Sequence, residues 1–150
     1  MNPYIRTATF KDALVVAQNL REEDLRELQG LGQTPLALPF NVALSNPAVT
    51  FLDKDGTIGG VAGIVPDPTP GVGLIWMLCT PVLVRKPHTF VRNAKKWIAE
   101  QTEYKLLWNI ADERNVFHHK LLRLLGFKAL RTVYPPPYAL PYLEIVKVCA

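Results

Sequence analysis

Histidine, cysteine and acidic side chains are the groups in this sequence that could bind a metal, act as nucleophiles or move protons. His118 and His119 are adjacent, and neighbouring side chains on a helix point about 100° apart, so the two cannot bind one metal from one face. Cys79 and Cys149 are too few for a disulfide framework or a zinc site. We therefore expect no metal, two reduced thiols and histidines that lie on the surface or pack.

A short acidic stretch, Asp112-Glu113, precedes Asn115, where the sequence predicts the start of a helix. Carboxylates at this position complement the positive end of the helix dipole. Either of them could instead act as a general base. The sequence favours the dipole role and leaves the catalytic one open.

Basic residues are concentrated in the second half of the chain. Residues 1–75 carry five Lys/Arg and eight Asp/Glu, whereas residues 76–150 carry twelve and five, which gives net charges of −3 and +7. A basic half suits an anionic partner such as nucleic acid, a phosphorylated cofactor or an acidic protein surface. A solvated basic face without a partner is the alternative. Nucleic acid is weakly supported, because no platform of interleaved aromatic and basic residues is visible.

Length and composition place these residues in a globular protein. The chain has 150 residues, 49% of them apolar, which predicts one domain over residues 1–150. No apolar run reaches the roughly 18 residues that a membrane-spanning helix needs, and the N-terminus lacks the basic-then-apolar order of a secretion signal. We therefore expect no membrane association, and a protein made and kept in a cytoplasm or packaged from one.

Apolar periodicity and turn residues predict alternating strands and helices. Pro87 suits the first turn of a helix, Asp55-Gly56 a hairpin turn, and the glycines in 57–65 a bulge or a close backbone approach. The predicted strands are 4–8, 49–52, 57–65, 72–83, 106–111, 128–134 and 143–148, and the predicted helices are 9–30, 36–44, 87–100 and 115–125. This order predicts an α/β (α+β) fold with a mixed, mostly antiparallel central sheet, one parallel step and helices on both faces.

Two further motifs have a structural interpretation. Trp76, Trp97 and Trp108 fall on predicted buried strands or on the inner face of a helix, so we expect them to pack in the core. The stretch 135–138, Pro-Pro-Pro-Tyr, has the form of a WW-domain ligand. A chance loop between the last two strands is the favoured interpretation.

The order of elements resembles the GNAT (N-acetyltransferase) fold superfamily. Residues 5–13 resemble its first strand and helix, and the stretch that begins with Asn115 and ends with Gly126-Phe127 is similar to its last helix. In that family the strands before and after the helix that here begins at Pro87 splay apart, and acetyl-coenzyme A (acetyl-CoA) lies in the gap. The resemblance therefore implies a GNAT-like domain that binds acetyl-CoA.

A narrower likeness is to the GNAT-like internal virion proteins of short-tailed (podovirus) bacteriophages. The motifs that carry it are residues 76–80, the basic helix from Pro87, residues 107–109, Arg114-Asn115, His118 and residues 125–127. This likeness implies a phage-encoded protein that stays in the host cytoplasm or is packaged in the virion. Members of the group are carried in virions or act as acyltransferases, and the likeness alone leaves both open.

The resemblance also assigns coenzyme-binding residues. Arg85, Lys86, His88 and Thr89 match the family's phosphate-binding turn and keep its charge, whereas its glycines are missing and Pro87 removes one N–H donor. A plain helix start with solvated basic residues is the alternative there. Asn115 would hold the pantetheine arm or cap its helix. The family's proton-donating Tyr is Leu122 here, so no catalytic residue is assigned.

Two functions follow from these motifs. The missing glycines and Leu122 favour a virion or host-interaction protein that uses a degenerate acetyltransferase scaffold to bind phage virion proteins or a host protein. The element order, Asn115 and Arg85-Lys86 favour an active acetyl-CoA-dependent N-acetyltransferase, acting on an amine of a host protein or of a small molecule. Fold alone is weak support for catalysis.

Overall fold

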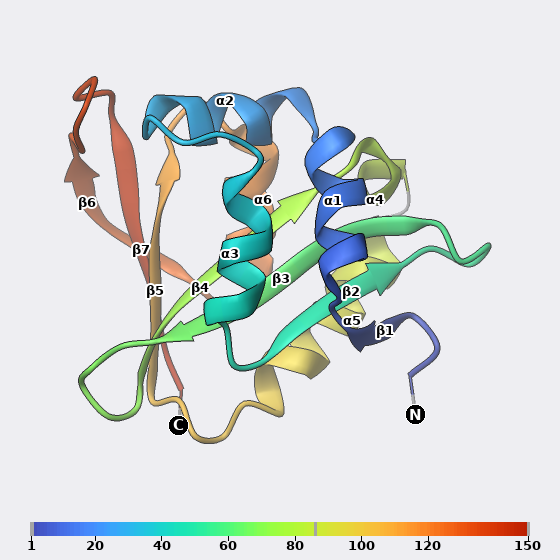
Figure 1. Cartoon of the computed structure of the whole chain (residues 1–150). Coiled ribbons are helices and arrows are strands. Elements are labelled where there is room, and N and C mark those ends of the chain that lie inside the picture. Colours follow the sequence, from blue (N-terminus) through green and yellow to red (C-terminus); the bar gives the residue numbers. More distant parts are fainter. Residues whose placement is uncertain (1, 86, 150) are drawn as a thin grey trace.

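Seven strands form one sheet in the computed structural model, which describes residues 2–85 and 87–149 (Figure 1). The strands are β1 (Ile5–Thr7), β2 (Ala48–Leu52), β3 (Ile58–Pro66), β4 (Val72–Cys79), β5 (Leu106–Asp112), β6 (Lys128–Val133) and β7 (Tyr142–Val148). Their order across the sheet is β1-β2-β3-β4-β5-β7-β6, and the only parallel neighbours among these described strands are β4 and β5. The predicted mixed, mostly antiparallel sheet with one parallel step is confirmed.

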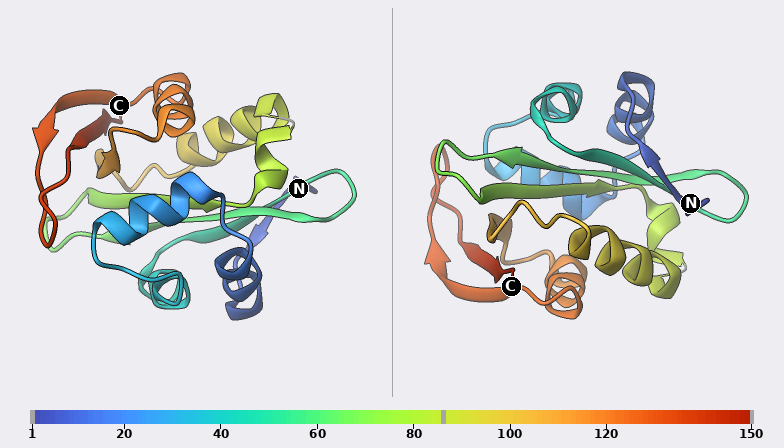
Figure 2. Two further views of the ribbon diagram at one scale, coloured as in Figure 1. Left: turned by 90° about the horizontal axis from the view of Figure 1, so that it is seen from above. Right: turned by 90° about the horizontal axis from the view of Figure 1, so that it is seen from below.

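Helices cover both faces of this sheet, as predicted. They are α1 (Phe10–Gln18), α2 (Glu22–Gly30), α3 (Ala37–Leu44), α4 (Pro81–Arg85), α5 (Pro87–Ala99) and α6 (Val116–Leu124). Helices α1 and α3 lie on one face, and α5 and α6 on the other (Figure 2). Each face has its own apolar core. One core joins Phe90, Trp97 and Leu121 to the sheet, and the other joins Val16 and Leu38 to it.

The β2–β3 hairpin forms where the sequence predicts it, with Gly56 in the left-handed region at φ +83°. The register shifts between Phe51 and Leu52, which pair with Gly60 and Ile58, so Gly59 is the extra residue of a bulge. The bulge is one of the two alternatives expected for the glycine-rich arm, and the other is also present, because a Cβ at Gly60 would lie 3.0 Å from the Leu78 carbonyl oxygen.

Two predicted elements were wrong in their extent, and tertiary contacts explain both. The helix predicted over 9–30 is split into α1 and α2, because Arg21 adopts an extended conformation and its N–H donates to the Cys79 carbonyl at 2.9 Å. The strand predicted over 72–83 ends at Cys79. Pro81, which suits a first helical position, then starts α4, and the Thr80 hydroxyl accepts the Val82 N–H at 3.3 Å.

Candidate functional site

The parallel strands β4 and β5 pair over three residues and then separate. Val72–Leu74 faces 106–108 in the ladder. Beyond it β4 stays paired with β3 as far as Cys79, and β5 stays paired with β7 as far as Asp112. Asn109 marks the point of separation, because its Nδ2 donates to the Ile75 carbonyl at 2.6 Å across the gap. The sheet therefore contains a wedge-shaped gap between two strands that are each held on their other edge.

Backbone groups of β4 face this gap. The Cys79 N–H donates to Asp24, and the Ile75 carbonyl accepts from Asn109, both on the β5 side of the strand, whereas the Thr80 N–H donates to Gly59 on the β3 side. Alternate residues of a strand direct their N–H and C=O groups to the same edge. Met77 lies between Ile75 and Cys79, so its N–H and C=O also point into the gap, where a ligand could bind them.

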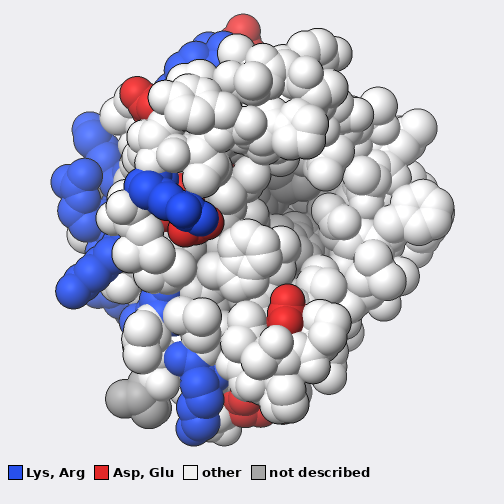
Figure 3. All heavy atoms as spheres, turned by 90° about the vertical axis from the view of Figure 1, so that its left-hand side faces the viewer, with Lys and Arg blue, Asp and Glu red and all other residues white. Residues whose placement is uncertain are grey.

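A cavity of about 590 Å³ passes through the sheet at the gap. On the α2–α3 side its walls include Leu28, Leu31, Asn41, Leu44, Trp76 and Trp108, and on the α5–α6 side they include Ala94, Trp97, Ile98, Leu122 and Leu125. Figure 3 shows a hollow in a mostly uncharged surface, with Lys and Arg side chains gathered to one side of it. The cavity is therefore largely apolar and is lined by residues from both faces of the sheet.

Glu27 and His118 form the ionisable pair in the cavity wall. Glu27 comes from α2 and His118 from α6, and His118 Nδ1 lies 3.3 Å from Glu27 Oε2. The same Oε2 accepts from Asn115 Nδ2 at 2.9 Å. Both contacts use Oε2, so Oε1 is the carboxylate oxygen left to accept a proton or a hydrogen bond from a ligand. Each side chain retains some exposure, 13% for Glu27 and 16% for His118.

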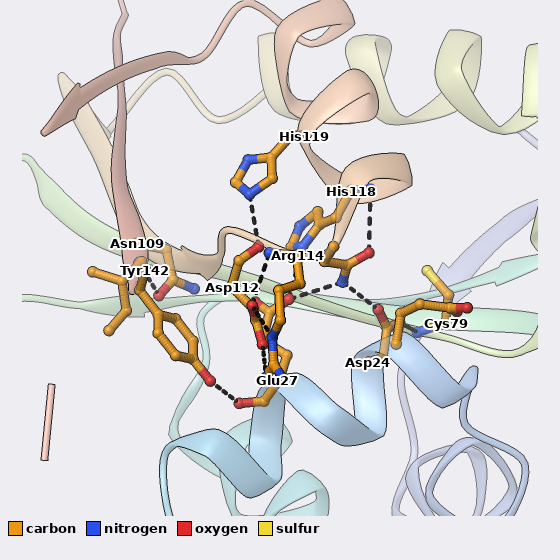
Figure 4. A network of polar contacts seen from close by, with 12 residues as sticks. Asp24, Glu27, Cys79, Asn109, Asp112, Arg114, His118, His119 and Tyr142 are labelled. Atoms are coloured by element: carbon orange, nitrogen blue, oxygen red, sulfur yellow. Dashed lines mark hydrogen bonds and ion pairs between the residues drawn. The ribbon is translucent and has the colours of Figure 1, made fainter. Parts of the chain in front are cut away.

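A buried network behind this pair joins α2 to β4 and to the start of α6 (Figure 4). Asp24 accepts from the Cys79 N–H at 2.8 Å, from Arg21 at 2.9 Å and from Asn115 Nδ2 at 3.1 Å. Burial raises the pKa of Asp24, although His118, Arg21 and the Cys79 N–H act to lower it. The network fixes α2 against the splayed strands and thereby fixes the position of Glu27.

The pKa of His118 is raised above its ordinary value of 6.5. Burial alone would lower it, but the charge and hydrogen bond of Glu27, together with the charge of Asp24, outweigh burial, and Arg21 opposes them. The imidazolium form is therefore stabilised in the folded protein.

This shift predicts a pH-dependent stability. Because the folded-state pKa is the higher one, the stabilisation is complete below about pH 6.5 and is lost as the pH rises through the folded-state pKa. We expect the free energy of unfolding, measured by denaturant titration at several pH values, to fall above pH 6.5 with a slope of at most about 1.4 kcal/mol per pH unit. His118→Gln should flatten the slope, whereas His88→Gln, at an exposed position, should retain it. A wild-type curve with no slope in this range would contradict the assignment.

Asp112 is held in a structural role. Its carboxylate is 1% exposed on the side chain and accepts from Arg114 Nη2 at 2.7 Å and Arg114 Nε at 3.0 Å. Burial acts to raise the pKa of Asp112, but the Arg114 hydrogen bonds and charge lower it overall. A carboxylate that is buried, paired and hard to protonate is a poor general base. Its position one turn before α6 agrees with the favoured, non-catalytic interpretation.

The residues predicted to bind coenzyme A lie apart from the cavity. Arg85 ends α4 and is exposed, His88 is exposed in the first turn of α5, and Thr89 lines a separate small hollow beside Phe51. Lys86 lies outside the described residues. Their assignment to the coenzyme stays a prediction.

Asn115 caps α6, which was one of the two roles predicted for it. Its Oδ1 accepts the His118 N–H at 3.4 Å, and its Nδ2 donates to Asp24 and Glu27. The residue is 1% exposed, so a pantetheine arm would compete with these internal bonds. The proposed contact of Asn115 with coenzyme A is untested.

No sequence pattern pointed to Glu27, and His118 was predicted to be a packed or surface residue. The two are 91 positions apart, and no local spacing links them. One sequence feature could have suggested an acidic partner for His118, namely the histidine and lysine residues near the start of α6. Leu122, in contrast, lines the cavity at the position where the resemblance places a tyrosine, so the difference from the family falls inside the site.

Metal and membrane features are missing from what the structure describes. Within residues 2–85 and 87–149, no three His, Cys, Asp or Glu side chains are grouped closely enough to hold a metal ion. None of the helices in those residues is long and apolar enough to cross a bilayer.

Comparison with known proteins identifies the fold. No protein-family model and no curated protein matches the sequence. Among solved structures, a GNAT-family acetyltransferase from Streptococcus pneumoniae superposes with a TM-score of 0.69 at 16% identity, covering 97% of this chain and 98% of that one. A GNAT superfamily phosphinothricin acetyltransferase from Sinorhizobium meliloti, in complex with acetyl-CoA, gives 0.72 at 16% identity, covering 100% and 90%.

A third similar structure is the spermidine N-acetyltransferase from Vibrio cholerae in complex with coenzyme A and spermine. Its TM-score is 0.70 at 9% identity, and the match covers 96% of this chain and 94% of that one. Similarity at these identities establishes the fold and does not establish an activity. The chain has the GNAT fold, which confirms the fold expected from the order of its elements.

Proposed function

We propose that the protein is an acetyl-CoA-dependent N-acetyltransferase that acts on a primary amine. The observation that carries the proposal is the cavity through the β4–β5 gap, which is lined by residues from both faces of the sheet and has Glu27 and His118 in its wall. Such a cavity offers one wall to each of two reactants, which can meet inside the sheet.

The α5–α6 side of the gap fits the thioester end of acetyl-CoA. Ala94, Ile98, Leu122 and Leu125 give this side an apolar wall that excludes water. The N–H and C=O of Met77 face the gap and can bind an extended, amide-bearing arm as an added strand would. Acetyl-CoA, when bound, supplies an activated acetyl group and a thiolate leaving group. A fixed N–H donor next to the reacting carbonyl is the kind of group that stabilises developing negative charge.

The phosphate end of the donor would lie near the junction of α4 and α5. Arg85 and His88 are exposed there and can screen phosphate charge. The short helix α4 occupies the place of a glycine-rich loop, so we infer that binding at this end depends on side-chain charge more than on backbone N–H groups.

The α2–α3 side fits the amine. An ammonium group must lose a proton before its nitrogen can attack a thioester, and Glu27 Oε1 is placed to accept that proton. His118, which contacts Oε2 of the same carboxylate, can take the proton on when its imidazole is neutral. We assign the two as the general-base pair of the proposed reaction.

The second candidate is the virion or host-interaction function. It is favoured by α4, which stands where the resemblance implies a glycine-rich loop, and by Leu122, at the position of the family's tyrosine. The likeness to internal virion proteins, the host or virion location and a phage or host protein partner rest on the sequence motifs alone and stay predictions. Under that function the cavity would bind no acetyl-CoA.

A thermal melt with and without acetyl-CoA tests the proposal. A ligand at about 100 times its dissociation constant adds roughly 2.7 kcal/mol, which raises the melting temperature of a domain of this size by several degrees. We expect that rise, and a smaller one for Arg85→Ala. Arg92→Ala removes the same charge at an exposed position of α5 and should leave the rise unchanged. No shift at millimolar acetyl-CoA would overturn the proposal and favour the scaffold function.

A further inference from the structure

We infer that the amine acceptor is a small, mainly apolar primary amine with a single positive charge. The inference rests on the proposed acetyl transfer and concerns the α2–α3 half of the same cavity. Three observations carry it, namely the aromatic and aliphatic walls, the shortage of charged groups and the limited volume.

Two tryptophans from neighbouring strands form one wall. Trp76 packs with the core on the α1–α3 face, and its indole is fixed by a hydrogen bond from Nε1 to Ser45 Oγ at 2.8 Å. Trp108 pairs in register with Leu74, which packs against the same core. Both lie in the cavity wall together with Leu28, Leu31 and Leu44. A hydrophobic group fits these walls, and a nearby cation gains from the indole faces.

Charge limits the acceptor further. Of the described residues that line the cavity, the ionisable ones are Glu27 and His118, and none is Lys or Arg. When His118 is neutral, the Glu27 carboxylate can neutralise one ammonium group. A second ammonium group would be buried against apolar walls without a partner, which is costly. The site therefore selects against polyamines.

The volume of the cavity limits the size of the acceptor. The cavity of about 590 Å³ must hold the acetyl end of the donor as well as the acceptor, and ligand pockets of roughly 300–1,000 Å³ suit one drug-sized molecule. Because the donor takes part of this volume, a small acceptor with a single ring or a short branched chain fits best.

Three probes of matched shape or contrasting charge test the inference. We propose to measure binding by isothermal titration of the full chain with 2-phenylethylamine, with spermidine, and with 2-phenylethanol, which has the ring but no ammonium group. We expect 2-phenylethylamine to bind at least tenfold more tightly than either of the other two. Comparable or tighter binding of spermidine, or no binding of 2-phenylethylamine, would overturn the inference.

A charge added to the wall should shift this preference. Asn41 lies in the cavity wall, so Asn41→Asp introduces a second carboxylate with little change of shape and should improve spermidine binding relative to 2-phenylethylamine by at least fivefold. Gln29→Glu adds the same charge at an exposed position of α2 and should leave the ratio unchanged. An equal shift in both variants would show a long-range charge effect and would overturn the role of the wall.

Failure of this inference can be told from failure of the proposed function, because amine binding is measured without acetyl-CoA. If acetyl-CoA raises the melting temperature but spermidine is the preferred amine, the acceptor class is wrong and the transferase stands. If 2-phenylethylamine binds selectively but acetyl-CoA does not bind, the amine site stands and the transferase is wrong.

Discussion

Replacing Glu27 by Gln is expected to lower kcat/KM for acetyl transfer to 2-phenylethylamine by about 100-fold or more, the scale of a lost general base. The substitution keeps the size of the side chain and an oxygen that can accept from Asn115, but it removes the charge that holds the proton of the acceptor. It also removes the main group that raises the pKa of His118. The rate can be followed through the free thiol of released coenzyme A.

The matched control is Glu22→Gln, an exposed position on the same helix, which should retain the wild-type rate. The acetyl-CoA-induced rise in melting temperature should persist in Glu27→Gln, because the donor half of the cavity is unchanged. A Glu27→Gln protein with an unchanged rate would exclude Glu27 as the base, whereas a loss of the thermal shift as well would show that the variant disrupts the cavity.

Replacing Asp24 by Asn is expected to destabilise the protein by about 3 kcal/mol, at the lower end of the cost of breaking a buried ion pair. The Asp24 oxygens accept from three donors, which are the Cys79 N–H, Arg21 and Asn115 Nδ2. An asparagine has one acceptor oxygen, so its NH₂ group must face at least one of these donors. Arg21, whose side chain is 7% exposed, also loses a buried counter-charge.

Thermal unfolding at pH 7.5 measures this effect, and about 3 kcal/mol corresponds to a fall of roughly 10 °C in the melting temperature. Glu22→Gln again serves as the control and should change the melting temperature little, as a surface substitution. If Asp24→Asn unfolds at the wild-type temperature, the network is not what holds α2 against β4. The acetyl-transfer rate of Asp24→Asn, measured below its melting temperature, should also fall, since Glu27 follows Asp24 by one helical turn.

Much of the fold could be read from the sequence, because its signals are local. The capping box of Thr9 and Asp12, with its two hydrogen bonds of 3.1 Å, starts α1 where the residue types predict it. Gly126, at φ +94°, follows α6 as expected of a helix end. Apolar alternation and turn residues likewise placed the strands in order. Each of these features depends on residues within a few positions of one another.

The elements whose extent was mispredicted are those whose ends depend on distant residues. Arg21 interrupts a helical pattern because its N–H meets the Cys79 carbonyl, and β4 stops at the same cysteine. Trp108, predicted as a core residue, is half-buried and lines the cavity. Strand periodicity shows which face of the sheet a side chain occupies, but it cannot show that two neighbouring strands separate and leave that face open.

The sequence by itself determined the order of the strands and the mostly antiparallel character of the sheet with its one parallel step. Only the tertiary structure decided the candidate site. Glu27 and His118 belong to helices at opposite ends of the chain, and they meet because β4 and β5 splay and the Asp24 network draws α2 across the gap. Residues that meet through non-local contacts have no characteristic spacing in the sequence. Caps and turns are formed by neighbouring residues, so their spacing can be recognised.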